Sequence, residues 1–158
     1  MLRKMSVIGG VAAIAVFVVA TLMPSAGAVD DGTRFIRVNS FTTEEAFVDV
    51  GPPNESLGDQ IVFSANLMRF GHRVGNVGVV CTITSLRTET VQCVATANFV
   101  RWFHGGGQIT VQGLLSGQPR DFTFPITGGS GAFVGAVGQV HVHQVNEGLE
   151  VLTFELRS

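Results

Sequence analysis

Residues 122–142, FTFPITGGSGAFVGAVGQVHV, decide the fold of this chain. Phe122, Phe124 and Ile126 alternate with polar residues, which is typical of a strand with one buried face. Three glycines within Gly128–Gly131 predict a turn that needs a positive φ or a close backbone approach. A second alternating run with Val140 and Val142 follows, without the lysine and helix of a phosphate loop. The stretch therefore predicts two antiparallel strands joined by a glycine corner.

The same period of two continues through the chain, and no helical periodicity follows residue 28. Short alternating runs separated by Gly, Pro, Asn and Asp indicate an all-β protein. The expected strands are 33–40, 44–50, 59–69, 74–86, 90–103, 107–115, 121–127, 136–145 and 149–156. About eight such strands in an antiparallel meander, with no helix to cover them, close best into an up-and-down barrel. The interior of such a barrel is just wide enough for side chains or one small ligand.

The first 28 residues predict an export signal. Arg3 and Lys4 precede an uncharged apolar run from Met5 to Met23, and residues 26–28 supply an A-x-A cleavage pattern. We therefore expect a secreted, extracellular protein whose single domain is 29–158. The alternative is an uncleaved N-terminal anchor, because the 19-residue apolar run could just span a bilayer.

Residues 29–158 contain eight arginines, no lysine and twelve acidic residues, a formal charge of −4. A negative chain without a run of basic residues predicts no nucleic-acid partner and, after signal cleavage, no membrane contact. The absence of lysine from this part excludes Schiff-base chemistry, and the absence of tyrosine excludes a phenolic acid.

Two cysteines fall on one predicted hairpin. A turn at Leu86-Arg87-Thr88 places Ser85 opposite Glu89, and the same register places Cys81 directly opposite Cys93. Both lie on the more apolar face of their runs. In an exported chain this arrangement predicts a disulfide, with two free thiols as the alternative. The closed loop is short, so we expect a stabilisation of about 2–3 kcal/mol.

The inward faces of the predicted strands are almost wholly apolar and include several small residues. We expect Phe63, Ala65, Phe99 and Phe124 to line a site for a hydrophobic small molecule. His141 and His143 share a strand face but alternate with Val140 and Val142, so they are expected outside. No third ligand is obviously placed beside them, and we expect neither a metal nor a cofactor.

The first strand, TRFIRVNS, leaves its orientation open because both of its faces carry apolar residues. If Phe35, Arg37 and Asn39 point inward, the lumen gains a guanidinium and an amide that could orient a ligand as catalytic groups. If Ile36 and Val38 point inward instead, Arg37 is solvated.

Residues 126–140 resemble the glycine motif of plant allene oxide cyclases and, more loosely, of dirigent proteins. The segments Gly58-Asp59 with IVFSANLM, GGQITVQG at 106–113 and the closing LEVLTFEL fit in the same order, so the resemblance covers residues 34–156. It implies a calycin-like barrel, and relatives of this type often form dimers or trimers, which implies a homo-oligomer.

The resemblance also bears on individual residues. Asn39 matches a lumenal asparagine of the cyclases, whereas Arg37 replaces their glutamate with the opposite charge. Ala65 stands where a second lumenal asparagine is found, and Cys81 matches the family's strand cysteine. The allene oxide cyclase reaction itself is therefore not expected. What the resemblance implies is a barrel that restricts the conformation of a bound molecule.

We accordingly expect a cofactor-independent cyclase, isomerase or dirigent-like protein that steers a hydrophobic small molecule without redox chemistry. The alternative is a lipocalin-like carrier that does not change its ligand, and a third possibility is a barrel packed solid. A solid lumen excludes the first two. A cavity with Arg37 outside favours carriage, and a cavity onto which Arg37 and Asn39 converge favours catalysis.

Overall fold

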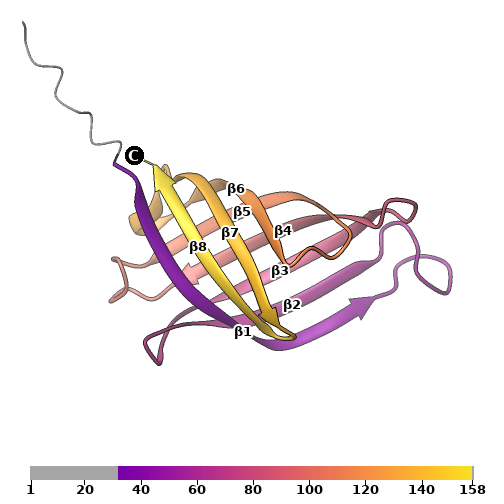
Figure 1. Ribbon diagram of the computed structural model, residues 1–158, viewed down its shortest axis with the longest axis horizontal. Helices are drawn as coiled ribbons and strands as arrows, with labels where there is room; N and C mark the ends of the chain where they lie inside the picture. Colours follow the sequence, from indigo (N-terminus) through magenta and orange to yellow (C-terminus); the bar gives the residue numbers. More distant parts are fainter. Residues whose placement is uncertain (1–31, 158) are drawn as a thin grey trace, which may run out of the picture.

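Alternation of apolar and polar residues builds a closed barrel of eight antiparallel strands (Figure 1). The computed structural model describes residues 32–157, so the predicted export segment 1–28 lies outside the described residues. The strands are β1 (Arg34–Val48), β2 (Gln60–Arg69), β3 (His72–Ser85), β4 (Thr90–Phe99), β5 (Gly107–Ser116), β6 (Asp121–Gly129), β7 (Val137–Asn146) and β8 (Leu149–Arg157). Each pairs with its neighbour in the chain, and β1 also pairs with β8, which confirms the predicted up-and-down barrel. Within residues 32–157 no helix is long and apolar enough to cross a membrane.

Two strand predictions are corrected by the structure. The runs 33–40 and 44–50 form one continuous strand, β1, because a bulge between Thr42 and Glu44 absorbs the break in alternation. The run 90–103 ends as a strand at Phe99, because residues 100–106 turn back over the end of the barrel and bury Phe103. The strand prediction extended too far because Phe103 continues the apolar alternation of β4.

Aromatic side chains close the end of the barrel at which β8 finishes. Phe99 packs against Phe103, Phe133 and Phe154, with ring centroids 5.4–5.6 Å apart. Phe133 belongs to η1 (Gly131–Phe133), the short 3₁₀ turn that follows the glycine motif. Gly131 has a φ of 63°, and a Cβ on Gly129 would collide with the backbone of Phe133. The predicted glycine corner is confirmed, and it places one ring of the aromatic plug.

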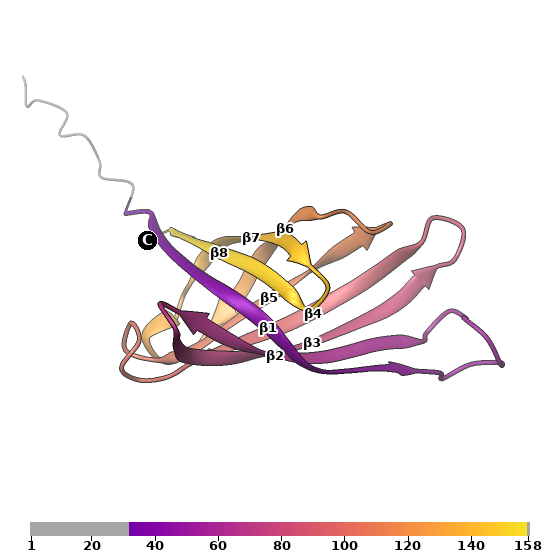
Figure 2. The same ribbon diagram turned by 60° about the horizontal axis from the view of Figure 1, so that its bottom comes forward.

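The opposite end stays open and is surrounded by residues 49–59, 86–89, 117–120 and 147–148. Figure 2 shows the β1–β2 and β3–β4 connections reaching far beyond β6–β8 at this end. The β1–β2 connection is fixed by the buried carboxylate of Asp59, which accepts hydrogen bonds from the backbone N–H groups of Val50 (2.9 Å) and Ser56 (2.6 Å). The hydrogen bond from Val50 is the largest contribution, and together these bonds hold the pKa of Asp59 below its usual value.

The predicted disulfide between Cys81 and Cys93 is present, on directly opposed residues of β3 and β4 whose Cα atoms lie 4.0 Å apart. The predicted register holds from Gly75 to Ile83, and a bulge then pairs Ser85 with Thr90 in place of Glu89. The two half-cystines are buried on the lumen side, so the bridge forms part of the inner wall.

Replacing both cysteines by alanine is expected to lower the free energy of unfolding by about 2–3 kcal/mol, because the bridge closes a loop with a sequence separation of 12. Urea titration followed by circular dichroism would measure the loss. The wild-type protein unfolded with a reducing agent present is the matched control and should lose a similar amount. An unchanged midpoint in both samples would contradict the expectation.

Candidate functional site

The barrel lumen contains a cavity of about 770 Å³ that opens at the end opposite the aromatic plug. This volume lies within the range of small-molecule sites. Its wall is formed mainly by inward apolar side chains of β2 to β8, among them Ile61, Phe63, Val79, Ala95, Val111, Phe122, Phe124, Val142, Leu152 and Phe154. The lumen is therefore not packed solid.

A glycine in this wall makes room for an aromatic ring. Gly113 on β5 lies opposite Cys93, and a Cβ on Gly113 would collide with the ring of Phe124. Phe124 can occupy its position only because residue 113 has no side chain. The Phe124 and Phe122 rings, both from β6, are 5.2 Å apart and present aromatic surface to the cavity. The wall is thus suited to a molecule with a flat apolar body.

One carboxyl group interrupts the strand walls of the cavity. Glu150 on β8 is half-buried and lines the lumen, two residues before the inward Leu152. Its neighbours in register are Ser40 on β1 and Gln144 on β7. Within the described part of the chain its side chain makes no hydrogen bond or ion pair. Desolvation by burial raises the pKa of the Glu150 carboxyl above its usual value.

Sequence reasoning missed Glu150, although a signal was present. Leu152, Phe154 and Leu156 alternate along the last strand, and the same period of two extends back to Glu150. A carboxyl at an inward position with no fixed partner, in a cleft, is a candidate proton donor or acceptor. Glu150 is therefore the candidate reactive group of this cavity.

The four predicted ligand-binding residues separate into two groups. Phe63 and Phe124 lie in the cavity wall. Ala65 and Phe99 are buried in the barrel core, beyond the residues that line the cavity, Phe99 as part of the aromatic plug. The two groups could not be distinguished from the sequence. The open part of the lumen ends where Phe103 and Phe133 pack across the barrel, and this packing is not visible in the strand pattern.

Of the two orientations left open for the first strand, the structure has the one with Ile36 and Val38 inside, so the assignment of Arg37 and Asn39 as catalytic groups in the lumen is corrected. Both are exposed on the outer face of β1, whereas Ile36 (0% exposed), Val38 and Ser40 fill the interior. An inward Arg37 would have placed an unpaired guanidinium in an apolar lumen, and the opposite register avoids that desolvation. The exposed Phe35 on the same outer face is what made the two registers look equivalent in sequence.

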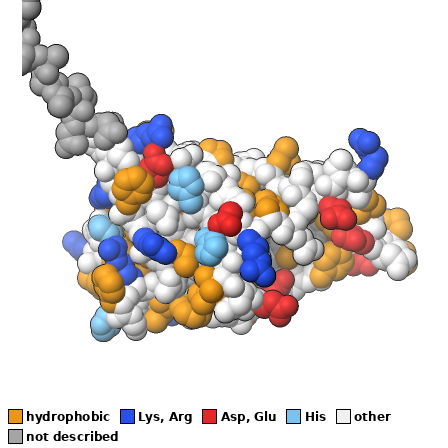
Figure 3. Space-filling view, in the orientation of Figure 1, with side chains coloured by type: hydrophobic (Ala, Val, Ile, Leu, Met, Phe, Trp, Pro, Cys, Tyr) orange, Lys and Arg blue, Asp and Glu red, His pale blue; other side chains and the backbone are white. Residues whose placement is uncertain are grey.

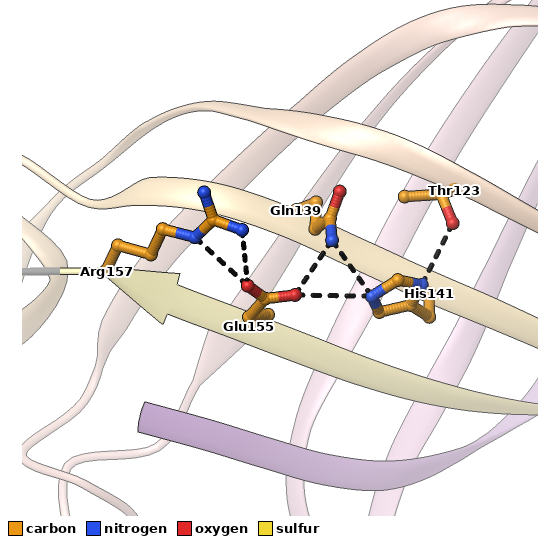
Figure 4. Close-up of polar contacts among 5 residues, drawn as sticks. All are labelled: Thr123, Gln139, His141, Glu155 and Arg157. Atoms are coloured by element: carbon orange, nitrogen blue, oxygen red, sulfur yellow. Dashed lines mark hydrogen bonds and ion pairs between the residues drawn. The ribbon is translucent and has the colours of Figure 1, made fainter. Parts of the chain in front are cut away.

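The outer face of β6–β8 holds the polar network drawn in Figure 4. Glu155 accepts hydrogen bonds from Arg157 (2.7 Å to Nη2) and from Gln139 (2.8 Å), while His141 Nδ1 lies 2.9 Å from Thr123 Oγ1. The contacts with Arg157, and next with Gln139, lower the pKa of Glu155 to about 2. His141 is outside the lumen, as predicted, and so is His143, which contacts Asp121 at 2.6 Å. No cluster of three metal-ligating side chains occurs within residues 32–157.

This network predicts a specific response to acid. A lowered folded-state pKa stabilises the protein above the ordinary value of 4.5, and the contribution is lost as pH falls from 4.5 towards 2. Glu155→Gln should therefore melt at a lower temperature than the wild type at neutral pH, and the gap should close near pH 2. Thermal melts across pH 2–7 would measure it, with Glu147→Gln, at an exposed residue, as control. A gap that persists unchanged at pH 2 would contradict the role of Glu155.

Comparison with known proteins places this geometry among related barrels. The sequence profile of the allene oxide cyclase barrel like domain matches residues 36–155. A pyocyanin demethylase is similar in structure, with a TM-score of 0.67 and 26% identity over 78% of this chain and 99% of that one. No curated protein matches the sequence.

Two further solved structures are similar in fold at lower identity. A pterocarpan synthase dirigent protein has a TM-score of 0.60 and 17% identity, covering 78% of this chain and 92% of its own. A Diels–Alderase from Streptomyces koyangensis has a TM-score of 0.59 and 16% identity, covering 78% of this chain and 64% of its own.

Proposed function

The chain belongs to the allene oxide cyclase barrel like family, and we propose that it binds a hydrophobic small molecule in its lumen and guides an isomerisation or cyclisation of that molecule. The observation that carries the proposal is the half-buried carboxyl of Glu150, which has no partner within residues 32–157 and stands in the mainly apolar strand wall of a cavity open at one end. No redox step or cofactor is required by this chemistry.

Glu150 would act by moving a proton. Its carboxylate accepts a proton from one atom of the bound molecule, and the resulting carboxylic acid returns a proton to another atom, so that the product is an isomer of the substrate. Burial makes the ionised form of the group more basic than an exposed glutamate, since its pKa is raised. The surrounding walls hold the molecule in one conformation, and positioning of that kind can itself contribute several kcal/mol.

The comparisons support a small-molecule role in a limited way. The dirigent protein and the Diels–Alderase are named for reactions on small organic molecules, and the pyocyanin demethylase acts on pyocyanin. A family member with an open lumen of about 770 Å³ is consistent with a ligand of similar size.

Carriage without chemistry is the second candidate. An open cavity with Arg37 and Asn39 on the outer surface is the arrangement expected of a lipocalin-like carrier. In that case Glu150 would serve only to orient or hold the ligand.

Two accompanying proposals concern location and assembly. The N-terminal sequence and the disulfide support an exported protein. Exposed apolar side chains on the outer faces of β1 and β7, including Phe35, Phe41 and Val137, support self-association into a dimer or trimer. Size-exclusion chromatography with light scattering would determine the assembly.

Native mass spectrometry of the protein purified from culture fluid, followed by incubation of any retained ligand in D₂O, tests the function. For the enzyme we expect a co-purifying apolar molecule that is recovered rearranged, or with deuterium at carbon. A carrier would release the same molecule unchanged. An empty protein that also fails to bind acridine, a flat apolar probe, would overturn both candidates.

A further inference from the structure

The ionisable residues in the cavity wall all have the same sign of charge. They are Glu55, Glu89 and Glu150, and within residues 32–157 no arginine, lysine or histidine lines the cavity. Glu55 and Glu89 are exposed on the loops that surround the opening, and Glu150 stands on the wall strand β8. A molecule that enters therefore passes carboxyl groups only, which disfavours an anion and favours a cation.

Charged residues are also distributed unevenly along the barrel, with most acids near the open end and most arginines near the closed end. Among residues 32–157, Arg87 and Arg120 are the only arginines around the open end. The carboxyl groups there are more numerous: Glu44, Glu45, Asp49, Glu55, Asp59, Glu89, Asp121, Glu147 and Glu150. Among residues 32–157 the closed end has one acid, Glu155, and the following arginines: Arg34, Arg69, Arg73, Arg101 and Arg157. In Figure 3 most acidic side chains lie towards the right and most basic ones towards the left. A separation of this kind draws cations towards the opening of the cavity.

Aromatic rings complete the recognition of a cation. Phe63, Phe122, Phe124 and Phe154 line the cavity, and each presents π-electron surface. A positive charge that is spread over a flat ligand is attracted to such rings, while the apolar body of the ligand buries against Val and Leu side chains. Carboxyl groups combined with aromatic walls are the surroundings in which organic cations are held in proteins.

Glu150 supplies the position at which the charge would be paired. Its carboxyl lines the cavity and has no protein partner within residues 32–157. Ser40 and Gln144, its neighbours in register, carry no charge. A ligand cation would give this group the partner that the described residues do not, and it would favour the ionised carboxylate.

We infer that the barrel takes a flat, mostly apolar ligand with a single delocalised positive charge, the chemical class of N-alkylated aromatic heterocycles. This inference rests on the proposed function, because it names the class of molecule that the same cavity receives.

Three probes of one shape but different charge test the inference: the cation 10-methylacridinium, neutral acridine and the anion acridine-9-carboxylate. Isothermal titration calorimetry on the whole protein, at a pH where acridine is neutral, should give at least tenfold tighter binding of the cation than of acridine, a difference of about 1.4 kcal/mol. The anion should bind most weakly, and higher salt should reduce the preference.

Two variants locate the effect. Glu150→Gln should remove most of the preference, and the double variant Glu55→Gln/Glu89→Gln should remove a smaller part, because these side chains are exposed. Neutral acridine is the matched control and should bind each variant as it binds the wild type.

The possible failures are distinct. Equal binding of the cation and neutral acridine would overturn the charge inference and leave the proposed function standing. A preference that survives unchanged in both variants would overturn it as well, because the cation would then bind elsewhere. If none of the three probes binds the wild type, both the inference and the proposed ligand-binding lumen fail.

Discussion

Glu150→Gln is expected to lower the rate of ligand conversion by at least about 100-fold, because general acid–base catalysis by a positioned side chain contributes roughly 10²–10⁴-fold. Glutamine keeps the size of the side chain and its capacity to form hydrogen bonds, but it cannot accept and return a proton. The measurement is kcat for the retained ligand, or the rate of deuterium uptake into that ligand in D₂O.

Binding and turnover must be separated in this variant. Neutral acridine should still bind within roughly threefold of the wild type, since the volume and the apolar wall of the cavity are unchanged. Glu147→Gln, an exposed carboxyl three residues away on the β7–β8 turn, is the matched control and should keep full activity. Glu150→Asp, which withdraws the carboxyl by one methylene, should retain part of the rate because positioning is impaired but proton transfer remains possible.

The pH dependence of stability gives an independent readout of Glu150. Its folded-state pKa lies above the ordinary value of 4.5 because of desolvation, so the folded protein binds more protons than the unfolded chain between those two values. The stability therefore falls as pH rises through this interval, and Glu150→Gln should remove that fall. A variant that melts at the same or a higher temperature at neutral pH but loses turnover supports proton transfer. Full turnover in a folded variant would remove Glu150 from the mechanism.

The hydrophobic pattern determined the barrel and much of its register, since a shift by one residue moves every side chain of a strand to the other face. Cys81 and Cys93 could be paired from sequence because both lie on one face of a local hairpin. The orientation of β1 could not be determined, because Phe35 makes its outer face as apolar as the inner one at that point. Only the closure of the barrel, in which β1 pairs with β8, resolves it.

The candidate site was harder to predict than the fold. A single acidic residue at the start of β8 looks like an ordinary turn residue, because it lies only two residues after Gly148 of the β7–β8 turn. Its position in the wall of a closed lumen depends on the pairing of β8 with β1, where Ser40, far away in the chain, lies opposite Glu150. The length of the open lumen likewise depends on long-range packing of the aromatic plug. Local periodicity places Glu150 on the inward face of its strand, but it does not show how far the open lumen extends.

Ala95→Trp is expected to weaken the binding of any lumenal ligand by more than about 100-fold, because Ala95 lines the cavity on β4 and an indole there would fill the space that the ligand needs. Thr96→Trp is the matched control: it adds an indole at the next residue, on the outer face, opposite Gly78, where space is open. Acridine titration by fluorescence measures both variants, and circular dichroism confirms their fold.

The smaller Ala95→Leu should give an intermediate loss of affinity and keeps the test valid if the indole prevents folding. Equal loss in the Ala95 and Thr96 variants, or no loss in either, would place the ligand outside the lumen. A loss of acridine affinity in the Ala95 variants alone would show that the ligand binds in the cavity and not on the surface. If Glu150→Gln also binds acridine as the wild type does, the walls provide the binding and the carboxyl provides the chemistry.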